Sequence, residues 1–392
     1  MIKIFILLPL MFFISSVTAQ NINFNKGKIK QKNYLQEIPY EKIVGIPIVP
    51  VTINGKMYNF ILDTGAMLVI SDRIYKELNL PILGRIIINS SSGEKKDMKY
   101  ISLPEISIQE ITFINTPGVV FHEESELFEC LGIDGIIGSN MLRNSVVQFD
   151  EQNKLIIITD NIKKLSLQKS KSQKMKLSSN QSLPFIIVTL QKEENIVDYR
   201  ALFDSGQSDF YNMSMNNFNE VIVSKIAESE GSFSFGIHGL HKKQKHLLIN
   251  IPNIIISGAT FCDLTVTTTH ANYSRIGAKL LKHGKTTLDY KKKRFYFEPF
   301  GNTNTIELSE KTWAISSSLQ DNKMIVGIIW DKELESKINL GDEILSINGI
   351  DIQSMSFCEL IIFEIASDDD KRILELRDIY TREIKKVEVK RM

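Results

Sequence analysis

The chain has 392 residues, which exceeds one typical domain and allows two or three separately packed cores. Its 47 Lys and Arg residues balance 46 Asp and Glu residues, so no global field favours nucleic acid or an anionic membrane as a partner. With 43% hydrophobic and 24% charged residues, the composition is typical of a soluble globular protein rather than a disordered or membrane protein.

The N-terminus predicts a signal peptide at residues 1–19. A short basic start, Met1-Ile2-Lys3, precedes an apolar run at 4–14 and small residues at 17–19. A membrane anchor is the alternative, but the apolar run is too short to span comfortably. We therefore expect a secreted or periplasmic protein after cleavage. The polar segment that follows, to residue 36, predicts a flexible leader.

Two stretches share one order of residues: three apolar residues, Asp, a hydroxyl residue and Gly. The first is Phe60-Ile61-Leu62-Asp63-Thr64-Gly65-Ala66, and 141 positions later comes Ala201-Leu202-Phe203-Asp204-Ser205-Gly206-Gln207. Hydrolysis of an amide by activated water needs one ionised carboxylate as base and one carboxylic acid. Each stretch would supply one of the two groups.

The segments around the two stretches also correspond. A hairpin signal at Asn54-Gly55 leads into the first stretch, and a charged turn at 193–195 leads into the second. Gly277 and Asp289 each lie 139 positions after Gly138 and Asp150. This indicates an internal duplication of one supersecondary unit. Short helices are expected at 71–78 and at about 214–227.

Two hairpin tips are candidate flaps over a substrate site. The first tip contains Ser92 and Gly93, and the second contains Gly236, Ile237, His238 and Gly239. Ordinary surface hairpins have the same polar or glycine-rich composition, so this alternative stays open.

The remaining segments complete the division of the chain. Residues 161–182 are rich in Lys, Ser and Gln and predict a solvated linker, and residues 310–392 do not repeat the earlier plan and predict a third module. Three cysteines, Cys130, Cys262 and Cys358, lie far apart without a zinc spacing. We expect three small buried residues, an interpretation that allows one bridged pair among them. The histidines form no metal pattern, so no metal or cofactor is expected.

These residues resemble the pepsin and retropepsin-like aspartic proteases, specifically a secreted bacterial form with two retropepsin-like halves and a C-terminal PDZ domain. The resemblance covers residues 38–392. It is carried by Asp63-Thr64-Gly65-Ala66 and Asp204-Ser205-Gly206, by Ile136-Ile137-Gly138 and Ile276-Gly277, and, for the PDZ domain, by Leu340-Gly341-Asp342 with Ile347-Asn348-Gly349.

The resemblance implies a mostly β, bilobal pepsin/retropepsin-like pseudo-dimer of two β-rich halves, plus a C-terminal PDZ-like α+β domain. The lobes would be residues 20–160 and 183–300, joined by the linker at 161–182 and followed by the PDZ-like domain at 310–392. The protein would be a monomer acting on extended peptide or protein substrates, and the PDZ-like groove would offer a second site for a peptide ligand.

The resemblance also assigns roles to residues. Asp63 and Asp204 would be the catalytic dyad of an aspartic endopeptidase, sharing a proton and holding the attacking water. The hydroxyls of Thr64 and Ser205 would brace the two loops, while Gly65 and Gly206 would let the backbone approach the dyad. No cofactor, metal or covalent enzyme intermediate is implied, and activity is expected at acidic to near-neutral pH.

The sequence departs from the family pattern at Gln207, at Arg275 before Ile276-Gly277, and at 312–315, where the PDZ carboxylate-binding loop is expected. These departures favour one alternative, a catalytically inactive peptide-binding or scaffold protein with an aspartic-protease fold. A β-sandwich lectin or adhesin is a third hypothesis, which would require the duplicated flanks to be accidental.

Overall fold

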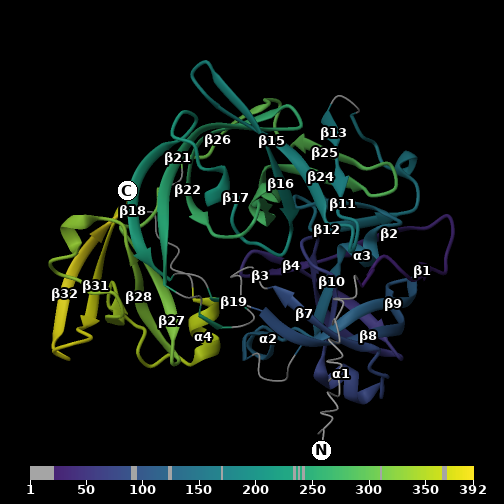
Figure 1. Ribbon diagram of the computed structural model, residues 1–392, viewed down its shortest axis with the longest axis horizontal. Helices are drawn as coiled ribbons and strands as arrows, with labels where there is room; N and C mark the ends of the chain where they lie inside the picture. Colours follow the sequence, from purple (N-terminus) through teal and green to yellow (C-terminus); the bar gives the residue numbers. More distant parts are fainter. Residues whose placement is uncertain are drawn as a thin grey trace, which may run out of the picture.

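The computed structural model describes residues 22–89, 95–121, 126–168, 171–232, 235–236, 239–240, 243–309, 311–363 and 369–392. Over these ranges the protein is mostly β, as expected, and its strands form several sheets (Figure 1). The predicted signal peptide and the flap residues Ser92, Gly93, Ile237 and His238 lie outside the described residues. None of the helices found in the described ranges is both long and apolar enough to cross a membrane.

The first sheet has nine strands in the order β1-β9-β6-β10-β5-β4-β8-β7, with β3 beside β4. Its strands are β1 (Lys28–Ile29), β3 (Glu41–Ile43), β4 (Ile46–Ile53), β5 (Lys56–Asp63), β6 (Leu68–Ser71), β7 (Gly84–Asn89), β8 (Lys95–Ile108), β9 (Ile111–Phe121) and β10 (Gly135–Gly138). The short helices α1 (Asp72–Glu77), α2 (Glu126–Cys130) and α3 (Ser139–Leu142) accompany it.

Local sequence signals explain two of these elements. Asn54 and Gly55 have φ of 49° and 78°, the left-handed values that a two-residue hairpin turn requires, and they turn β4 into β5. Asp63 is the last residue of β5. Helix α1 begins after Ser71, whose side chain accepts a hydrogen bond from the Ile74 N–H, which confirms the helix expected at 71–78.

The second sheet also has nine strands, in the order β14-β15-β16-β23-β17-β22-β21-β18, with β26 beside β22. Its strands are β14 (Lys176–Leu177), β15 (Pro184–Lys192), β16 (Asn195–Asp204), β17 (Tyr211–Ser214), β18 (Ser224–Gly231), β21 (Gln244–Ile256), β22 (Ala259–Thr269), β23 (Ser274–Gly277) and β26 (Thr305–Glu307). A small separate pair, β19 (Phe235–Gly236) and β20 (Gly239–Leu240), lies between β18 and β21 in sequence.

The two large sheets share one pairing plan. In the first, β5 runs parallel to β10, which is antiparallel to β6, and β6 is parallel to β9. In the second, β16 is parallel to β23, which is antiparallel to β17, and β17 is parallel to β22. The duplicated sequence segments therefore fold into corresponding strands.

A six-stranded joining sheet connects the two large sheets, in the order β13-β25-β24-β11-β12-β2. Its strands are β2 (Leu35–Pro39), β11 (Val146–Asp150), β12 (Leu155–Thr159), β13 (Ser172–Lys174), β24 (Gly284–Asp289) and β25 (Arg294–Pro299). The antiparallel pairing of β11 with β24 brings strands from the two duplicated segments together. One hydrophobic core extends through all three sheets and includes Phe60, Phe149 and Phe203.

The C-terminal sheet has six strands in the order β27-β28-β29-β31-β32, with β30 beside β29, and its own hydrophobic core. Its strands are β27 (Ile315–Gln320), β28 (Lys323–Ile329), β29 (Glu343–Ile347), β30 (Ile350–Asp351), β31 (Lys371–Arg377) and β32 (Ile384–Lys390). Helix α4 (Phe357–Ile362) begins with a capping box formed by Ser356 and Glu359.

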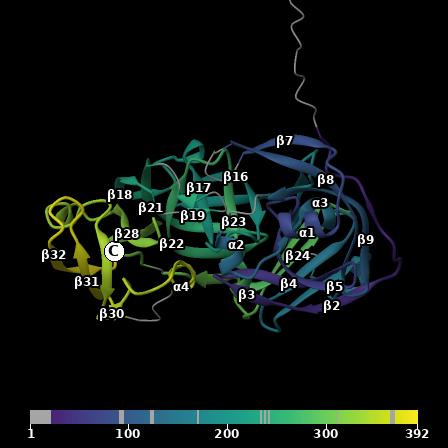
Figure 2. The same ribbon diagram turned by 90° about the horizontal axis from the view of Figure 1, so that it is seen from below.

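The C-terminal sheet contacts both large sheets of the molecule. A disulfide joins Cys130 at the end of α2 to Cys358 in α4. Helices α2 and α4 lie next to each other in Figure 1. On the other side, the Ser232 N–H donates to the Gly327 carbonyl at 3.1 Å, where β18 reaches β28. Figure 2 shows the three parts in a row, with the second sheet between the C-terminal sheet and the first sheet.

The cysteine expectation allowed for one bridged pair, and Cys130 and Cys358 form it. The expected burial is wrong, because Cys130 is only partly buried and Cys358 is exposed. Cys262 is not disulfide-bonded and is only partly buried. Spacing could not identify the partners, since 228 positions separate them.

Three segments differ from expectation. The leader is packed from residue 22 onward, because Phe24 and Tyr34 are buried and β1 pairs with β9. The helix expected at 214–227 is only a short 3₁₀ turn at 215–217, since the buried residues Ile222 and Val223 lead directly into β18. The expected linker at 161–182 contributes β13 and β14, anchored by the buried side chain of Met175.

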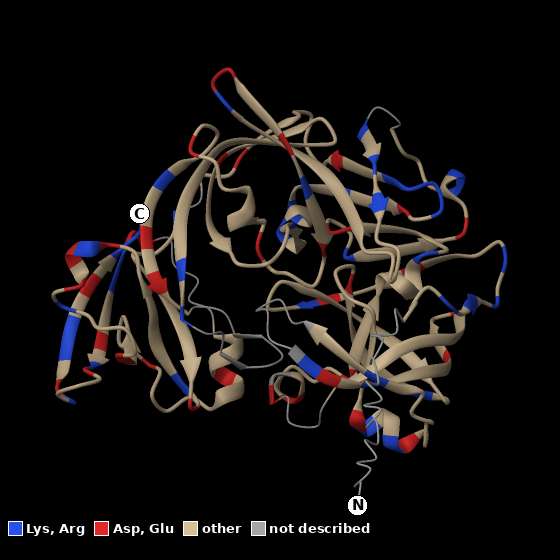
Figure 3. Ribbon diagram, viewed as in Figure 1, with Lys and Arg blue, Asp and Glu red and all other residues tan. Residues whose placement is uncertain are grey.

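Charged residues of both signs are spread along all the sheets (Figure 3). This distribution agrees with the nearly neutral net charge of +1.

Candidate active site

Asp63 and Asp204 occupy corresponding places in the two large sheets. Each is the last residue of the strand that pairs in parallel with a short glycine-ended strand, and the register places Asp63 opposite Gly138 and Asp204 opposite Gly277. No side chain fits at either glycine without movement of the backbone. A Cβ atom on Gly138 would lie 2.2 Å from the backbone of Met67, and one on Gly277 would lie 2.1 Å from the Asp209 carbonyl oxygen.

The residues after each aspartate are interlocked across the sheets. The Thr64 N–H donates to the Ser205 hydroxyl and the Ser205 N–H donates to the Thr64 hydroxyl, both at 3.0 Å. Each hydroxyl then donates to the opposite strand, Thr64 to the Phe203 carbonyl at 2.6 Å and Ser205 to the Leu62 carbonyl at 2.7 Å. Both side chains are fully buried, so the four bonds fix the two strand ends against each other.

The structure brings the two carboxyl groups together against the glycines that follow. A Cβ atom on Gly65 would lie 2.5 Å from Cγ of Asp204, and one on Gly206 would lie 2.3 Å from Cγ of Asp63. Each glycine N–H also donates to its own aspartate, Gly65 to Asp63 Oδ1 at 2.7 Å and Gly206 to Asp204 Oδ1 at 3.2 Å. Each carboxyl group therefore touches the backbone of the other stretch.

Burial raises the pKa of Asp63 well above its usual range. The negative charge of Asp204 and a hydrogen bond between the two carboxyl groups raise it further, while the Gly65 N–H and the charge of Arg275 oppose the rise. Two carboxyl groups this close do not both ionise readily, so the pair can hold one proton between them. Such a pair combines an acid and a base in one site.

Of the two departures from the family pattern at Gln207 and Arg275, the structure places Arg275 beside the pair. Arg275 extends from β23 and its Nε lies 3.5 Å from Oδ2 of Asp204, with side chains only 16% and 12% exposed. The side-chain amide atoms of Gln207 are buried and have no hydrogen-bond partner among the described residues, so Gln207 does not bond to the carboxyl groups.

A second layer of contacts behind Thr64 was not anticipated from the sequence. The Ser139 hydroxyl donates to the Thr64 carbonyl at 2.7 Å and accepts from the Tyr290 hydroxyl at 2.8 Å. Tyr290 is completely buried, and burial raises its pKa. The duplication gave no signal here, because Ala278 corresponds to Ser139 and Glu151 corresponds to Tyr290.

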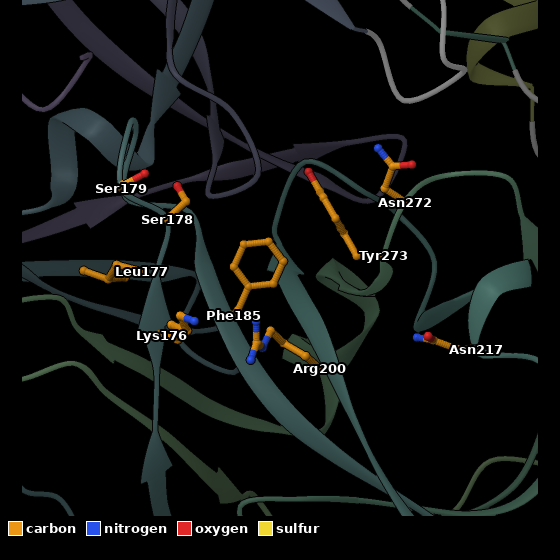
Figure 4. Close-up of a pocket in the computed structure, with 9 residues that line it drawn as sticks. All are labelled: Lys176, Leu177, Ser178, Ser179, Phe185, Arg200, Asn217, Asn272 and Tyr273. Carbon is orange, nitrogen blue, oxygen red and sulfur yellow. The ribbon is translucent and has the colours of Figure 1, made fainter. Parts of the chain in front are cut away.

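Gly236 and Gly239, the predicted flap residues within the described chain, pair with each other across β19 and β20. A cavity of about 610 Å³, lined in part by Phe185, Arg200 and Tyr273, contains neither aspartate. In Figure 4 the rings of Phe185 and Tyr273 stand in this cavity, near Arg200. Among the described residues, no group of three or more His, Cys, Asp or Glu side chains is placed to hold a metal ion.

Comparison with known proteins identifies one part of the chain. No curated protein matches it. Residues 49–141 match the family model for aspartyl proteases, a range that contains Asp63, Thr64, Gly65 and Gly138 but not Asp204. The resemblance expected from the sequence is thereby confirmed for this range, which is similar to the aspartyl proteases.

Proposed function

We propose that this chain is an aspartic endopeptidase that hydrolyses peptide bonds with water activated between Asp63 and Asp204. The observation that carries the proposal is the contact of each carboxyl group with the glycine of the opposite stretch. The aspartyl protease match at residues 49–141 supports it for the part that contains Asp63. Asp204 lies outside that match, and its assignment as the second dyad residue is supported by the strand pairing that the two sheets share.

The chemistry follows from one proton shared by two carboxyl groups. The ionised carboxylate takes a proton from water as the water oxygen bonds to the carbonyl carbon, and the other carboxyl group gives its proton to the carbonyl oxygen. The carboxyl group that took the proton from water then gives it to the amide nitrogen, while the other carboxylate takes a proton from a hydroxyl of the tetrahedral intermediate. The C–N bond breaks, an acid and an amine are released, and the dyad again holds one proton. In this scheme Thr64, Gly65, Ser205 and Gly206 hold the two groups in place, and no covalent enzyme intermediate is needed.

The proposal extends to the organisation of the chain. The two large sheets and the joining sheet would be a retropepsin-like pseudo-dimer within one monomer, with lobes at 20–160 and 183–300. The C-terminal sheet with α4 would be a PDZ-like domain at 310–392 that offers an edge for an extended peptide ligand. Hairpin tips around Ser92 and Gly93 and around residues 236–239 would cover the substrate.

The proposed location is secreted or periplasmic, after removal of the signal peptide at 1–19. The disulfide between Cys130 and Cys358 supports it, because such bridges persist mainly in oxidising compartments outside the cytoplasm. The catalytic scheme acts on a peptide bond, and the proposed substrates are extended peptide or protein segments.

A second candidate function is a peptide-binding scaffold without cleavage. The ion pair between Arg275 and Asp204 favours it, because a cation beside the dyad is a departure from the family pattern. This candidate predicts peptide binding that is indifferent to pepstatin-like inhibitors, and specific cleavage at any pH would refute it.

The test is cleavage of a diverse peptide mixture by the secreted form from about pH 3 to about pH 8, beside Asp63→Asn and Asp204→Asn. We expect the parent to cleave and both variants to lose activity. A matched control, Asp263→Asn, removes an exposed carboxylate on β22 and should keep full activity. Cleavage by either dyad variant at the parental rate would overturn the proposal, as would a folded parent that cleaves nothing.

A further inference from the structure

The two carboxyl groups have nearly equivalent surroundings, apart from one charged side chain. Each accepts an N–H bond from its own glycine and each touches the opposite glycine. Arg275 breaks this equivalence, because it is ion-paired with Asp204 at 3.5 Å and acts on Asp63 only through its charge. In the first sheet the corresponding residue is the buried, uncharged Ile136.

We propose that Arg275 is a positioning residue that keeps Asp204 as the ionised member of the dyad and leaves the shared proton on Asp63. Asp204 would then be the base that takes a proton from water, and Asp63 the acid that protonates the carbonyl oxygen. The inference rests on the proposed protease function for its catalytic meaning.

Two opposing influences decide where the proton resides. The Gly65 N–H approaches Asp63 at 2.7 Å, closer than the 3.2 Å of the Gly206 N–H to Asp204, and this favours ionisation of Asp63. The difference between two similar N–H dipoles is small beside a full positive charge at 3.5 Å from Asp204 in a largely buried site. The charge of Arg275 therefore prevails, and Asp204 is the ionised group.

The surroundings hold Arg275 in this position. Its guanidinium lies 5.8 Å from the ring centroid of Tyr273, which itself packs edge-on against Phe185 at 5.1 Å. Tyr290, which follows β24, also interacts with Asp63, and it is neutral over the working pH range because burial raises its pKa. Arg275 thus supplies a positive charge that distinguishes the two carboxyl groups.

The experiment compares pH profiles of kcat/KM for the parent, Arg275→Met and Arg275→Lys. Removing the positive charge makes each ionisation of the dyad harder. Both the acidic and the basic limb of the pH profile of kcat/KM should therefore move to higher pH by about one unit in Arg275→Met, with KM nearly unchanged. Arg275→Lys retains the charge and should stay close to the parent. Arg73→Met, which breaks an Arg–Asp ion pair in the first sheet away from the dyad, should leave the profile unmoved.

A second readout does not need activity. Carboxyl ¹³C NMR titration, with the Asp63 signal assigned by Asp63→Asn, should show Asp63 titrating at higher pH in Arg275→Met than in the parent. If the parent cleaves but neither the profile nor the titration moves, the role of Arg275 is refuted and the protease proposal stands. If the parent cleaves nothing while the titration moves as expected, the protease proposal fails and the electrostatic role of Arg275 remains.

Discussion

At the scale of single residues, the burial of Asp63 makes stability depend on pH. Its folded-state pKa lies above the ordinary value of 3.8, so ionisation is harder in the folded chain than in the unfolded one. Below pH 3.8 both states are protonated and nothing is lost. As the pH rises through the folded-state pKa, the folded state loses stability relative to the unfolded state.

Asp63→Asn removes this ionisation while keeping the shape of the side chain. We expect the variant to have a higher free energy of unfolding than the parent at neutral pH, and the difference to disappear as the pH falls below 3.8. Urea unfolding at a series of pH values measures it. Asp97→Asn is the exposed control, and a parent that is the more stable of the pair at neutral pH would contradict the expectation.

The glycines beside the dyad give a second prediction at this scale. In Gly206→Ala the new methyl group would meet Cγ of Asp63 at 2.3 Å, so the carboxyl group must move. A displacement of about 1 Å at a catalytic group costs roughly 100-fold in rate, and kcat/KM should fall by at least about that factor. In Gly301→Ala the nearest atom is 4.0 Å away, so activity should be retained. Equal activities of the two variants would refute the role of Gly206.

At the scale of elements, the ends of β5 and β16 are fixed by the crossed hydroxyl bonds of Thr64 and Ser205. Thr64→Val keeps the shape but leaves the Ser205 N–H and the Phe203 carbonyl without these partners in a fully buried place. We expect a loss of about 3 kcal/mol in the free energy of unfolding, measured by urea denaturation. Thr303→Val, at an exposed turn, should change it by less than about 0.5 kcal/mol. A loss no larger than that of the control would show that the hydrogen bonds of the Thr64 hydroxyl contribute little to the free energy of unfolding.

Elements with a strong local signal could be predicted from the sequence. Asn54-Gly55 turned β4 into β5, Ser71 capped α1, and the glycines at 138 and 277 lie opposite Asp63 and Asp204. Pairing between distant segments could not be predicted. The helix expected after Ser214 does not form, and the end of that segment instead begins β18, which pairs with β21. Tertiary contacts here override a weak local helix propensity. Likewise, no spacing pattern in the sequence predicts the ion pair of Arg275 with Asp204 or the hydrogen bond of Tyr290 with Ser139.

At the scale of the whole molecule, the Cys130–Cys358 bridge is the long-range covalent link. It closes a loop of 228 residues, for which the chain-entropy model gives about 5 kcal/mol as an upper value. Replacing both cysteines by Ser should lower the free energy of unfolding by roughly 3 to 5 kcal/mol, measured by chemical denaturation with hydrogen exchange in the C-terminal sheet. Cys262→Ser, which breaks no disulfide, is the control. An unchanged unfolding midpoint in the double variant would contradict the expectation.

The same bridge has a mechanical consequence when taken with the contact between Ser232 and Gly327. The joining sheet connects the first sheet to the second by pairing β11 with β24. The second sheet contacts the C-terminal sheet where β18 reaches β28, and the disulfide connects the C-terminal sheet to helix α2 beside the first sheet. Three bodies linked in a ring form a closed linkage. A rotation that separated two of them would therefore also move the third, so the C-terminal sheet would take part in any such rearrangement.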